Sequence, residues 1–255
     1  MKKSVVARII FILLFLIIWQ LLYQLKIWPE LLFPSVSQVG KALVVSFEKR
    51  HLGGMVLHSL VLLLKGLLMG IVLSFILSGL FSLNESLSAV YNMIVSMFDL
   101  IPGIALIPVA ILWLGIGDES IIFMVIHSVL WPMSRSIIDG FKAIPQIYVE
   151  VGRNIGLDGI KLLLGVYFPA SFERVFSGIK IGWARAWRGL ISAEMVFGGG
   201  TALGIGYFIT DRRTNLDLAG IFAAIIVIVM IGAIIEYGVF KTIEKYTVVK
   251  WGMVH

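Results

Sequence analysis

The stretch Tyr148–Ala170, YVEVGRNIGLDGIKLLLGVYFPA, is the longest region of mixed charge in an otherwise apolar chain. Pro145 precedes it and can begin a helix, because the missing proline N–H would have no intrahelical partner there. The four-residue spacing of Ile147, Val151 and Ile155 gives that helix one apolar stripe. Such a helix is too short and too polar to cross a bilayer. The stretch therefore predicts a surface element held between two membrane-spanning segments.

The same stretch predicts a sharp turn followed by a second helix. Gly156 stands where a helix commonly ends in a left-handed glycine. Asp158 follows at a position where its side chain can cap a new helix, which runs toward Pro169. The charged side chains of this element are expected to face outward; they are Glu150, Arg153, Asp158 and Lys161. An element of this form is suited to docking another protein.

This element resembles the EAA loop, the signature of the permease subunits of bacterial ABC importers. Glu150, Gly156 and Pro169 have the spacing of that loop. Val151 and Gly152 stand where the pattern has two alanines, so the second position departs from it and the third keeps only small size.

Two further blocks resemble the nitrate, sulfonate and taurine branch of these permeases. They are IALIPVAILWLGIG at Ile104–Gly117 and WRGLISAE at Trp187–Glu194. Together with the EAA-like loop they stand in the order of the family. The resemblance covers nearly the whole chain beyond about Phe33, and the chain is identified as a member of that branch.

The resemblance implies an all-α membrane protein with the MetI-like permease fold, about six transmembrane helices and a cytoplasmic coupling helix. Residues 1–255 would form one permease domain, with an N-terminal helix and external segment in 1–55. The core would span 56–245 and contain the coupling loop 145–170. The residues expected to couple to an ATPase are Glu150, Val151, Gly152, Arg153, Gly156, Leu157 and Pro169.

The resemblance also implies the partners. These are ABC ATPase subunits, a second permease copy in a homodimer, and an extracytoplasmic substrate-binding protein. No cofactor is expected on this chain, since ATP and Mg would be bound by the ATPase.

Composition independently indicates an integral membrane protein. Of the 255 residues, 59% are hydrophobic and 14% are charged, whereas soluble domains carry about 25% charged residues. The net charge of +6 comes from basic residues scattered at segment ends. This distribution suits contact with anionic lipid headgroups and excludes a nucleic-acid-binding patch. The chain has no cysteine, so disulfides and thiolate metal sites are excluded.

Six apolar segments are expected to cross the bilayer. The first follows Lys2, Lys3 and Arg8 and has no small-residue cleavage site after it, so we interpret it as a span and not as a signal peptide. The third is broken at Pro102, and Ile104–Leu114 is expected to fold back or tilt. The predicted spans are Ile9–Leu25, Val56–Ser82, Ser86–Ile101, Ser120–Ile138, Phe172–Phe197 and Leu218–Phe240. A short surface helix is expected to begin at Pro34-Ser35.

The distribution of basic residues predicts that both termini lie in the cytoplasm and that the protein is a multi-pass protein of the plasma or inner membrane. Eleven basic residues fall in the segments taken as internal, against six in those taken as external. The same orientation places the coupling loop in the cytoplasm. The external six are Lys26, Lys41, Lys49, Arg50, Arg212 and Arg213.

Enzymatic chemistry is not indicated. The chain has no Walker A pattern, no HExxH and no nucleophile-elbow serine motif. Its four histidines are scattered and predict no metal site. The glycines at 198–200, 204 and 206 look like a phosphate loop but follow a membrane span, so we interpret them as a flexible external loop.

The fifth predicted span carries two stripes when its residues are placed at about 100° intervals. One stripe holds the glycines together with Arg185, and Arg188 lies at its edge. The other holds Trp187 and Glu194. Charges at membrane depth are costly and usually face a cavity or a partner. The residues expected to line a translocation path are Arg185, Arg188, Ser192, Glu194, Trp187 and Pro102.

Two interpretations of the arginines remain open. They line a pore and attract an anion, or they pair with a carboxylate on another helix, such as Asp99 or Glu194. Arg185 and Glu194 lie on opposite faces of their own helix and cannot pair within it. The glycines on the arginine stripe can also mark close helix packing.

The sequence thus favours the membrane-spanning permease of an ATP-driven importer for a small anionic solute of the nitrate, sulfonate, taurine or bicarbonate kind. The alternative is an ion-coupled secondary transporter that uses Glu194 and Asp99. Such transporters often contain paired halves, and no repeat is found here. The substrate stays open, because specificity in such systems resides largely in the binding protein.

Overall fold

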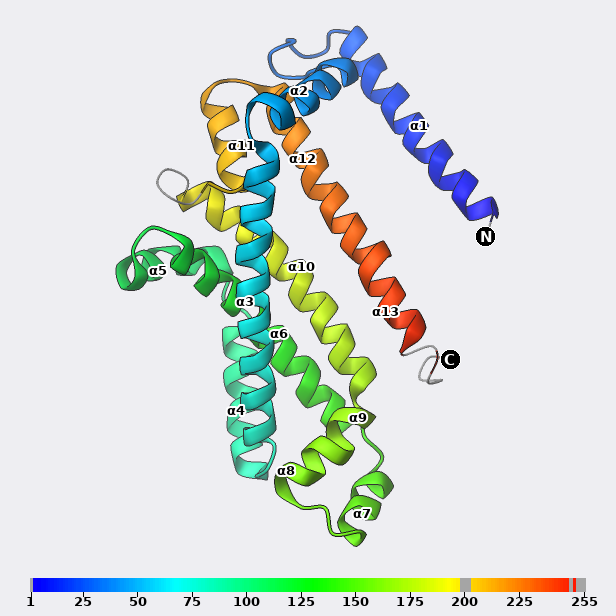
Figure 1. The fold of residues 1–255 in the computed structure, drawn as a ribbon, viewed down its shortest axis with the longest axis vertical. Helices are drawn as coiled ribbons and strands as arrows, with labels where there is room; N and C mark the ends of the chain where they lie inside the picture. Colours follow the sequence, from blue (N-terminus) through cyan, green and yellow to red (C-terminus); the bar gives the residue numbers. More distant parts are fainter. Residues whose placement is uncertain (1, 198–202, 248–249, 251–255) are drawn as a thin grey trace.

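The computed structural model describes residues 2–197, 203–247 and 250, and throughout these residues every regular element is helical. Figure 1 shows a long helical bundle. The α-helices are α1 (Lys2–Gln24), α2 (Val36–Lys49), α3 (Leu52–Phe81), α4 (Glu85–Phe98), α5 (Ile107–Leu114), α6 (Asp118–Lys142), α7 (Gln146–Asn154), α8 (Gly159–Leu162), α9 (Phe168–Ala170), α10 (Phe172–Phe197), α11 (Ile205–Thr214), α12 (Leu218–Ala233) and α13 (Lys241–Tyr246). A 3-10 turn, η1 (Gly103–Leu106), and two π-helical segments, η2 (Leu163–Tyr167) and η3 (Ile234–Phe240), join them.

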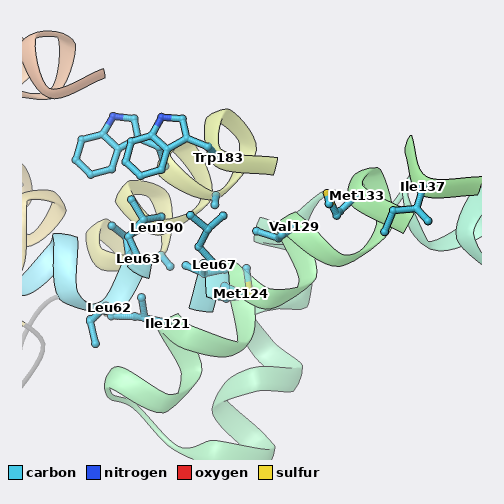
Figure 2. Packing of buried hydrophobic residues seen from close by; sticks show 14 of the residues in the cluster. Leu62, Leu63, Leu67, Ile121, Met124, Val129, Met133, Ile137, Trp183 and Leu190 are labelled. Atoms are coloured by element: carbon cyan, nitrogen blue, oxygen red, sulfur yellow. The ribbon is translucent and has the colours of Figure 1, made fainter. Parts of the chain in front are cut away.

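The core lies where α6 packs along α10 and α3. Figure 2 shows how side chains of these three helices meet there. The helices approach closely because glycines of one helix face side chains of the next. A Cβ added at Gly66 of α3 would lie 2.5 Å from Cγ1 of Val125, and one added at Gly178 of α10 would lie 2.6 Å from Cβ of Ser136. The glycines of the arginine stripe therefore do mark close helix packing, as membrane helices commonly show.

Length and composition identify four single helical segments among the described residues that can cross a membrane. They are Val6–Gln24, Leu52–Phe81, Asp118–Lys142 and Leu218–Tyr246. A fifth candidate is the pair Glu85–Phe98 and Gly103–Leu114, which is bent by 90°. The predicted break at Pro102 is thus confirmed, because the chain turns there and sends α5 out to one side of the bundle (Figure 1).

The fifth predicted span differs from the others. Phe172–Phe197 forms one unbroken helix, α10, with the predicted limits and 26 residues. It is about 39 Å long, enough to cross a bilayer. Because it carries several charged residues, it is not among the candidate membrane spans that composition identifies within the described chain. Composition alone therefore supports four to five spans, and the expected six are reached when the charged but central α10 is counted.

The two ends of the bundle carry different elements. α7 and α8 lie at one end, while α2 and α11 lie at the other, and α1 stands apart from the bundle (Figure 1). The predicted start of a surface helix at Pro34-Ser35 is confirmed, because Ser35 caps α2 in a capping box with Gln38.

One prediction about the end of the bundle opposite α7 is wrong in part. The glycines at 204 and 206 were expected in a flexible external loop, but they form the start of α11. Residues 198–202, the remainder of that predicted loop, lie outside the described residues. The reason is a buried carboxylate that binds the first turn of α11, described below.

Candidate functional site

The first candidate surface is built on α7, whose ends are both defined by the sequence. Pro145 occupies the N-cap position. At the other end Gly156 has a φ of +83°, in the left-handed region that favours glycine. The N–H of Leu157 donates to the carbonyl of Gly152 at 3.0 Å, and the N–H of Gly156 donates to that of Arg153 at 2.9 Å. These two bonds form a Schellman motif, so the predicted glycine stop is confirmed.

Gly152 explains why a small residue is needed in the third position of the EAA-like triplet. A Cβ added there would lie 2.8 Å from Leu162 Cδ1 and 2.8 Å from Val166 Cγ2. α7 is thus seated closely against the helical segment that follows it. A larger residue there would require the Leu162 and Val166 side chains, or α7 itself, to shift.

The second predicted helix of this element forms in three pieces: α8, the π-helical η2 and α9. Asp158 occupies the N-cap position of α8, but its side chain makes no capping hydrogen bond. The prediction that its side chain caps this helix is therefore wrong. The start of α8 instead depends on backbone geometry, with Gly159 at a φ of +52°.

One face of α7 is apolar and exposed, and two of its side chains, Val151 and Ile155, line the cavity described next. Ile147, Val151 and Ile155 are 59%, 50% and 72% exposed, and the flanking Glu150 and Arg153 are exposed as well. An apolar stripe of this kind on a single chain commonly marks a contact surface. We call this face, formed by these five residues, the α7 surface.

A cavity of about 700 Å³ lies beside the α7 surface, between α7, the end of α6 and the start of α10. Of the residues predicted to couple to an ATPase, Val151, Gly152, Leu157 and Pro169 line it. Glu150, Arg153 and Gly156 do not line it, and they are exposed. The coupling role of all seven stays a prediction.

A second cavity, of about 310 Å³, lies where the α4–α5 break meets α6 and α10. We call it the arginine cavity. Four of the residues predicted to line a translocation path meet there: Pro102, Arg185, Arg188 and Ser192. They come from two elements far apart in sequence.

Ion pairs hold one of the two cavity arginines. Arg185 Nη1 lies 2.5 Å from Asp99 Oδ1, and Arg135 Nε lies 3.4 Å from Asp99 Oδ2. The interpretation that pairs Arg185 with Asp99 of another helix is confirmed. Asp99 is shared by two arginines and its side chain is only 13% exposed, so it joins the end of α4 to α6 and α10.

Arg188 differs from Arg185 in its partners. Its Nε donates to the carbonyl of Ala184 in its own helix at 3.0 Å, and no carboxylate of the described chain lies within 4.0 Å of its guanidinium group. This region holds three positive charges, from Arg135, Arg185 and Arg188, and one negative charge, from Asp99. Two positive charges are therefore uncompensated. The electrostatics favour a bound anion.

Trp187 and Glu194, also predicted for the path, lie elsewhere. Trp187 stacks on Trp183 with ring centroids 6.1 Å apart, and both are buried. Glu194 is fully buried. Neither residue lines the arginine cavity, and their part in a translocation path stays a prediction.

The Glu194 carboxylate joins three helices. Its Oε1 accepts a hydrogen bond from the Ser59 hydroxyl of α3 at 2.6 Å, and its Oε2 accepts one from the Gly206 N–H at 2.8 Å. Ser59 Oγ in turn accepts from the Ile205 N–H at 2.9 Å. Two free N–H groups at the start of α11 are thus satisfied. We call this set of residues the Glu194 clasp.

A third, apolar cavity of about 250 Å³ adjoins the arginine cavity. His127 and Trp131 of α6 line both. Both ring nitrogens of His127 and Nε1 of Trp131 are buried and lack a hydrogen-bond partner in the described part of the chain. The His127 ring is therefore packed without a hydrogen bond to the described chain.

Sequence reasoning did not identify Arg135 or Ser59 as members of these clusters. Arg135 lies 36 residues from Asp99, and Ser59 lies 135 residues from Glu194. No local spacing connects such pairs. An unpaired carboxylate in an apolar segment is a signal that a distant partner exists, but it does not indicate which residue that partner is.

Comparison with known proteins places these features in a family. The family described as "Binding-protein-dependent transport system inner membrane component" matches residues 66–246. The chain is similar to a probable ABC transporter permease protein of Haemophilus influenzae, at 28% identity over 249 residues, 96% of this chain and 98% of that protein. It is similar to the taurine transport system permease protein of Escherichia coli, at 22% identity over 232 residues, 88% of this chain and 82% of that protein. A nitrate import permease protein of Synechocystis is 30% identical over 136 residues, 53% of this chain and 48% of that protein.

Proposed function

The chain belongs to the family of binding-protein-dependent transport system inner membrane components, and on that premise we propose that it carries a small anionic solute inward through the arginine cavity. It is the permease subunit of an ABC importer, a multi-pass membrane protein that acts in transport and not as an enzyme. Subunits of this family work with an ATPase and a substrate-binding protein. ATP and Mg would be bound by the ATPase.

The observation that carries the anion proposal is Arg188. It lies beside a cavity, has no acidic partner in the described chain, and stands next to an arginine pair that shares one carboxylate. A cation at membrane depth is costly without a partner. An anion that passes through the cavity would supply that partner for a limited time, which is what transport needs.

The α7 surface supports docking of the ATPase at this end of the bundle. Its exposed apolar stripe is flanked by Glu150 and Arg153, so a partner can find both apolar contact and opposite charge. The Schellman motif and the close contact at Gly152 fix α7 against the bundle. A push on this seated helix would be passed through η2 and α9 to α10, because each of these segments contacts the next.

We also propose that the α7 end faces the cytoplasm and that two copies of the chain assemble as a homodimer. The excess of basic residues in the predicted internal segments supports the orientation. The exposed apolar side chains of α5, among them Leu112 and Trp113, support a second copy on that side.

The ion-coupled alternative has less support. Asp99 is already paired with two arginines, and Glu194 is buried in the clasp. Neither carboxylate is presented to a cavity without a partner, as a group that takes up a coupling ion should be.

The test is to purify the tagged full-length chain from its own cells and to reconstitute it in vesicles. We expect an ATPase subunit to copurify, and uptake of nitrate or taurine, the solutes in the relatives' names, to require ATP and the binding protein. Uptake driven by an ion gradient with this chain alone would overturn the proposal in favour of a secondary transporter.

A further inference from the structure

We propose that the Asp99 carboxylate occupies the anion position of the arginine cavity while the protein is empty, and that a transported anion takes its place at Arg185. Asp99 then moves toward Arg135, and it returns to Arg185 when the anion leaves. This inference rests on the proposed function and deepens it, because it identifies a residue that sets how tightly the cavity holds its anion. The ligand class is a small oxyanion, such as nitrate or a carboxylate.

Asp99 is an acidic group on the wall of a basic cavity. It lines the cavity together with Arg185 and Arg188, and it is the only acidic residue among the described residues of that lining. Its Oδ1 lies 2.5 Å from Arg185 Nη1, a contact of the kind that a bound oxyanion makes with a guanidinium group. Asp99 therefore fills, in the empty protein, a position that a small anion can also fill.

Arg135 gives the displaced carboxylate a second partner. Its Nε lies 3.4 Å from Asp99 Oδ2, and Arg135 is not among the described residues that line the cavity. A carboxylate that leaves Arg185 can thus remain paired outside the lining. A buried charge that loses its only partner is strongly destabilising, and sharing of Asp99 between two arginines avoids this.

The pair between Asp99 and Arg185 is accessible enough to exchange. The Arg185 side chain is 41% exposed, and ion pairs with a solvated partner contribute little stability. Asp99 also directly follows the last residue of α4 and precedes the 90° bend. No further turn of α4 therefore holds it in place.

The charges favour exchange over simple addition of an anion. An anion bound at Arg188 would share a cavity of about 310 Å³ with the Asp99 carboxylate, and like charges at such short range repel. Movement of Asp99 toward Arg135 removes that repulsion. Arg185 and Arg188, three residues apart on one helix face, are then both available to the anion.

Nitrate binding to the tagged full-length chain, purified in micelles with its ATPase, tests the exchange. The melting temperature of the tagged chain is measured at increasing nitrate concentrations, with ionic strength held constant by fluoride, because a ligand of the folded state raises it in a saturable way. Asp99→Asn removes the competing charge and should bind nitrate about tenfold more tightly than the parent, a difference of about 1.4 kcal/mol. Arg188→Gln gives the shift that nitrate causes without binding in the cavity.

A charge-balanced double variant separates competition from a general gain of positive charge. Asp99→Asn combined with Arg135→Gln removes one charge of each sign, so it keeps the net charge of the parent and both cavity arginines. We expect the same gain in affinity as in Asp99→Asn, and the double variant carries the test if Asp99→Asn alone is not folded. Asp139→Asn is the matched control and should bind as the parent does, because it removes a negative charge from an exposed residue of α6 outside the cavity lining.

Formate supplies a second readout, because it replaces the carboxylate that Asp99→Ala removes. This variant should melt at a lower temperature than the parent. Formate should raise that temperature in a saturable way, whereas neutral formamide should not, and the parent should respond only to higher formate concentrations. Equal effects of formate and formamide on Asp99→Ala would overturn the inference.

Unchanged nitrate affinity in both Asp99→Asn variants would overturn the inference and leave the proposed function standing, provided that the parent shows a shift that Arg188→Gln lacks. A gain in Asp99→Asn that disappears in the double variant would also overturn it, because net charge and not competition would then be the cause. Absence of an Arg188-dependent shift from every variant would contradict both this inference and the proposed anion cavity.

Discussion

Gly156 shows most clearly how one residue defines the α7 surface. Its φ of +83° is open to glycine, tolerated by asparagine and strained for a branched side chain. No atom of the described chain lies within 4 Å of an added Cβ, so the demand is for backbone conformation and not for space. The spacing in the sequence predicted this stop correctly because a helix-ending glycine is a local signal.

Gly156→Val should therefore uncouple the transporter while leaving the membrane bundle folded. The strain would undo the Schellman motif, tilt α7 and weaken ATPase binding or separate hydrolysis from uptake. Gly156→Asn is the matched control, because asparagine accepts the left-handed conformation, and should keep most of the coupling. ATPase copurification and ATP-driven uptake are measured for both variants, and normal values for the valine variant would contradict the assigned role of α7.

Arg185 and Arg188 should respond differently to the same substitution. Arg185→Gln leaves Asp99 with Arg135 alone, at 3.4 Å, so we expect a lower melting temperature and a loss of about 1–2 kcal/mol. This is below the 3–5 kcal/mol typical of a fully buried broken pair, because the arginines are partly exposed. Arg188→Gln breaks no ion pair in the described chain and should lower uptake at unchanged stability.

The measurement for this pair is thermal melting beside uptake in reconstituted vesicles. Arg135→Gln serves as a reference for loss of one Asp99 partner without a change on α10. Equal loss of stability in Arg185→Gln and Arg188→Gln would assign both arginines a structural role and contradict the difference seen between them here.

Among the helices, α11 depends on a contact that no sequence pattern predicts. The Glu194 clasp binds its first turn to α3 and α10. We expect Glu194→Gln to lower the free energy of unfolding by about 1–3 kcal/mol. The glutamine amide has one acceptor oxygen, so either the Ser59 hydroxyl or the Gly206 N–H loses its partner in the interior.

Ser59→Ala should be destabilising by a similar amount, and the double variant should lose less than the sum, since both changes remove the same hydrogen bond. Thermal melting of the two single variants and the double variant gives the coupling. Strict additivity would show that Ser59 and Glu194 do not act as one clasp.

The connection between α2 and α12 supplies a pH-dependent contribution outside the membrane spans. Asp217 caps α12 through the Gly220 N–H at 2.9 Å and pairs with Arg50 at 2.5 Å. Burial alone would raise the pKa of Asp217, but its hydrogen bonds from Gly220, Arg50 and Arg212 outweigh burial and hold that pKa below its ordinary value.

The stability that follows is complete above the ordinary aspartate pKa of about 4 and is lost as pH falls through the lower folded value. Asp217→Asn should thus reduce stability by about 1–2 kcal/mol at pH 7, seen as a lower melting temperature, and have a smaller effect at a pH low enough to protonate Asp217 in the folded parent. A difference between variant and parent that is the same at both pH values would contradict this account.

Elements with local signals were predictable and contacts between distant residues were not. The limits of α10, the break at Pro102 and the start of α2 follow from hydrophobic runs, proline and a capping serine. The start of α11 was missed because glycines usually indicate a loop, whereas the buried Glu194 and Ser59 bind the first turn of a helix there. The sequence left two carboxylates as possible partners of Arg185, and the structure shows that the partner is Asp99.

At the scale of the whole molecule, α10 connects the two candidate regions. It begins beside the cavity next to the α7 surface and passes the arginine cavity on its way to the Glu194 clasp. A displacement of its first turns is passed along a continuous helix to Arg185 and Arg188. Under the proposed function, this helix is the physical route from the proposed ATPase site at α7 to the proposed anion site at the arginine cavity.

The central claim is that Arg188 makes this cavity positive and open to water on the transport path. Its most direct test is the reaction rate of the single thiol in Ser192→Cys with an anionic and a cationic methanethiosulfonate reagent, measured on the complex with its ATPase before and after ATP is added. Ser37→Cys, at an exposed position on α2, corrects for the intrinsic rates. The account predicts that the anionic reagent reacts about tenfold faster at Ser192, that ATP changes the rate, and that Arg188→Gln removes the preference. Equal rates for the two reagents, or a preference that survives Arg188→Gln, would contradict it.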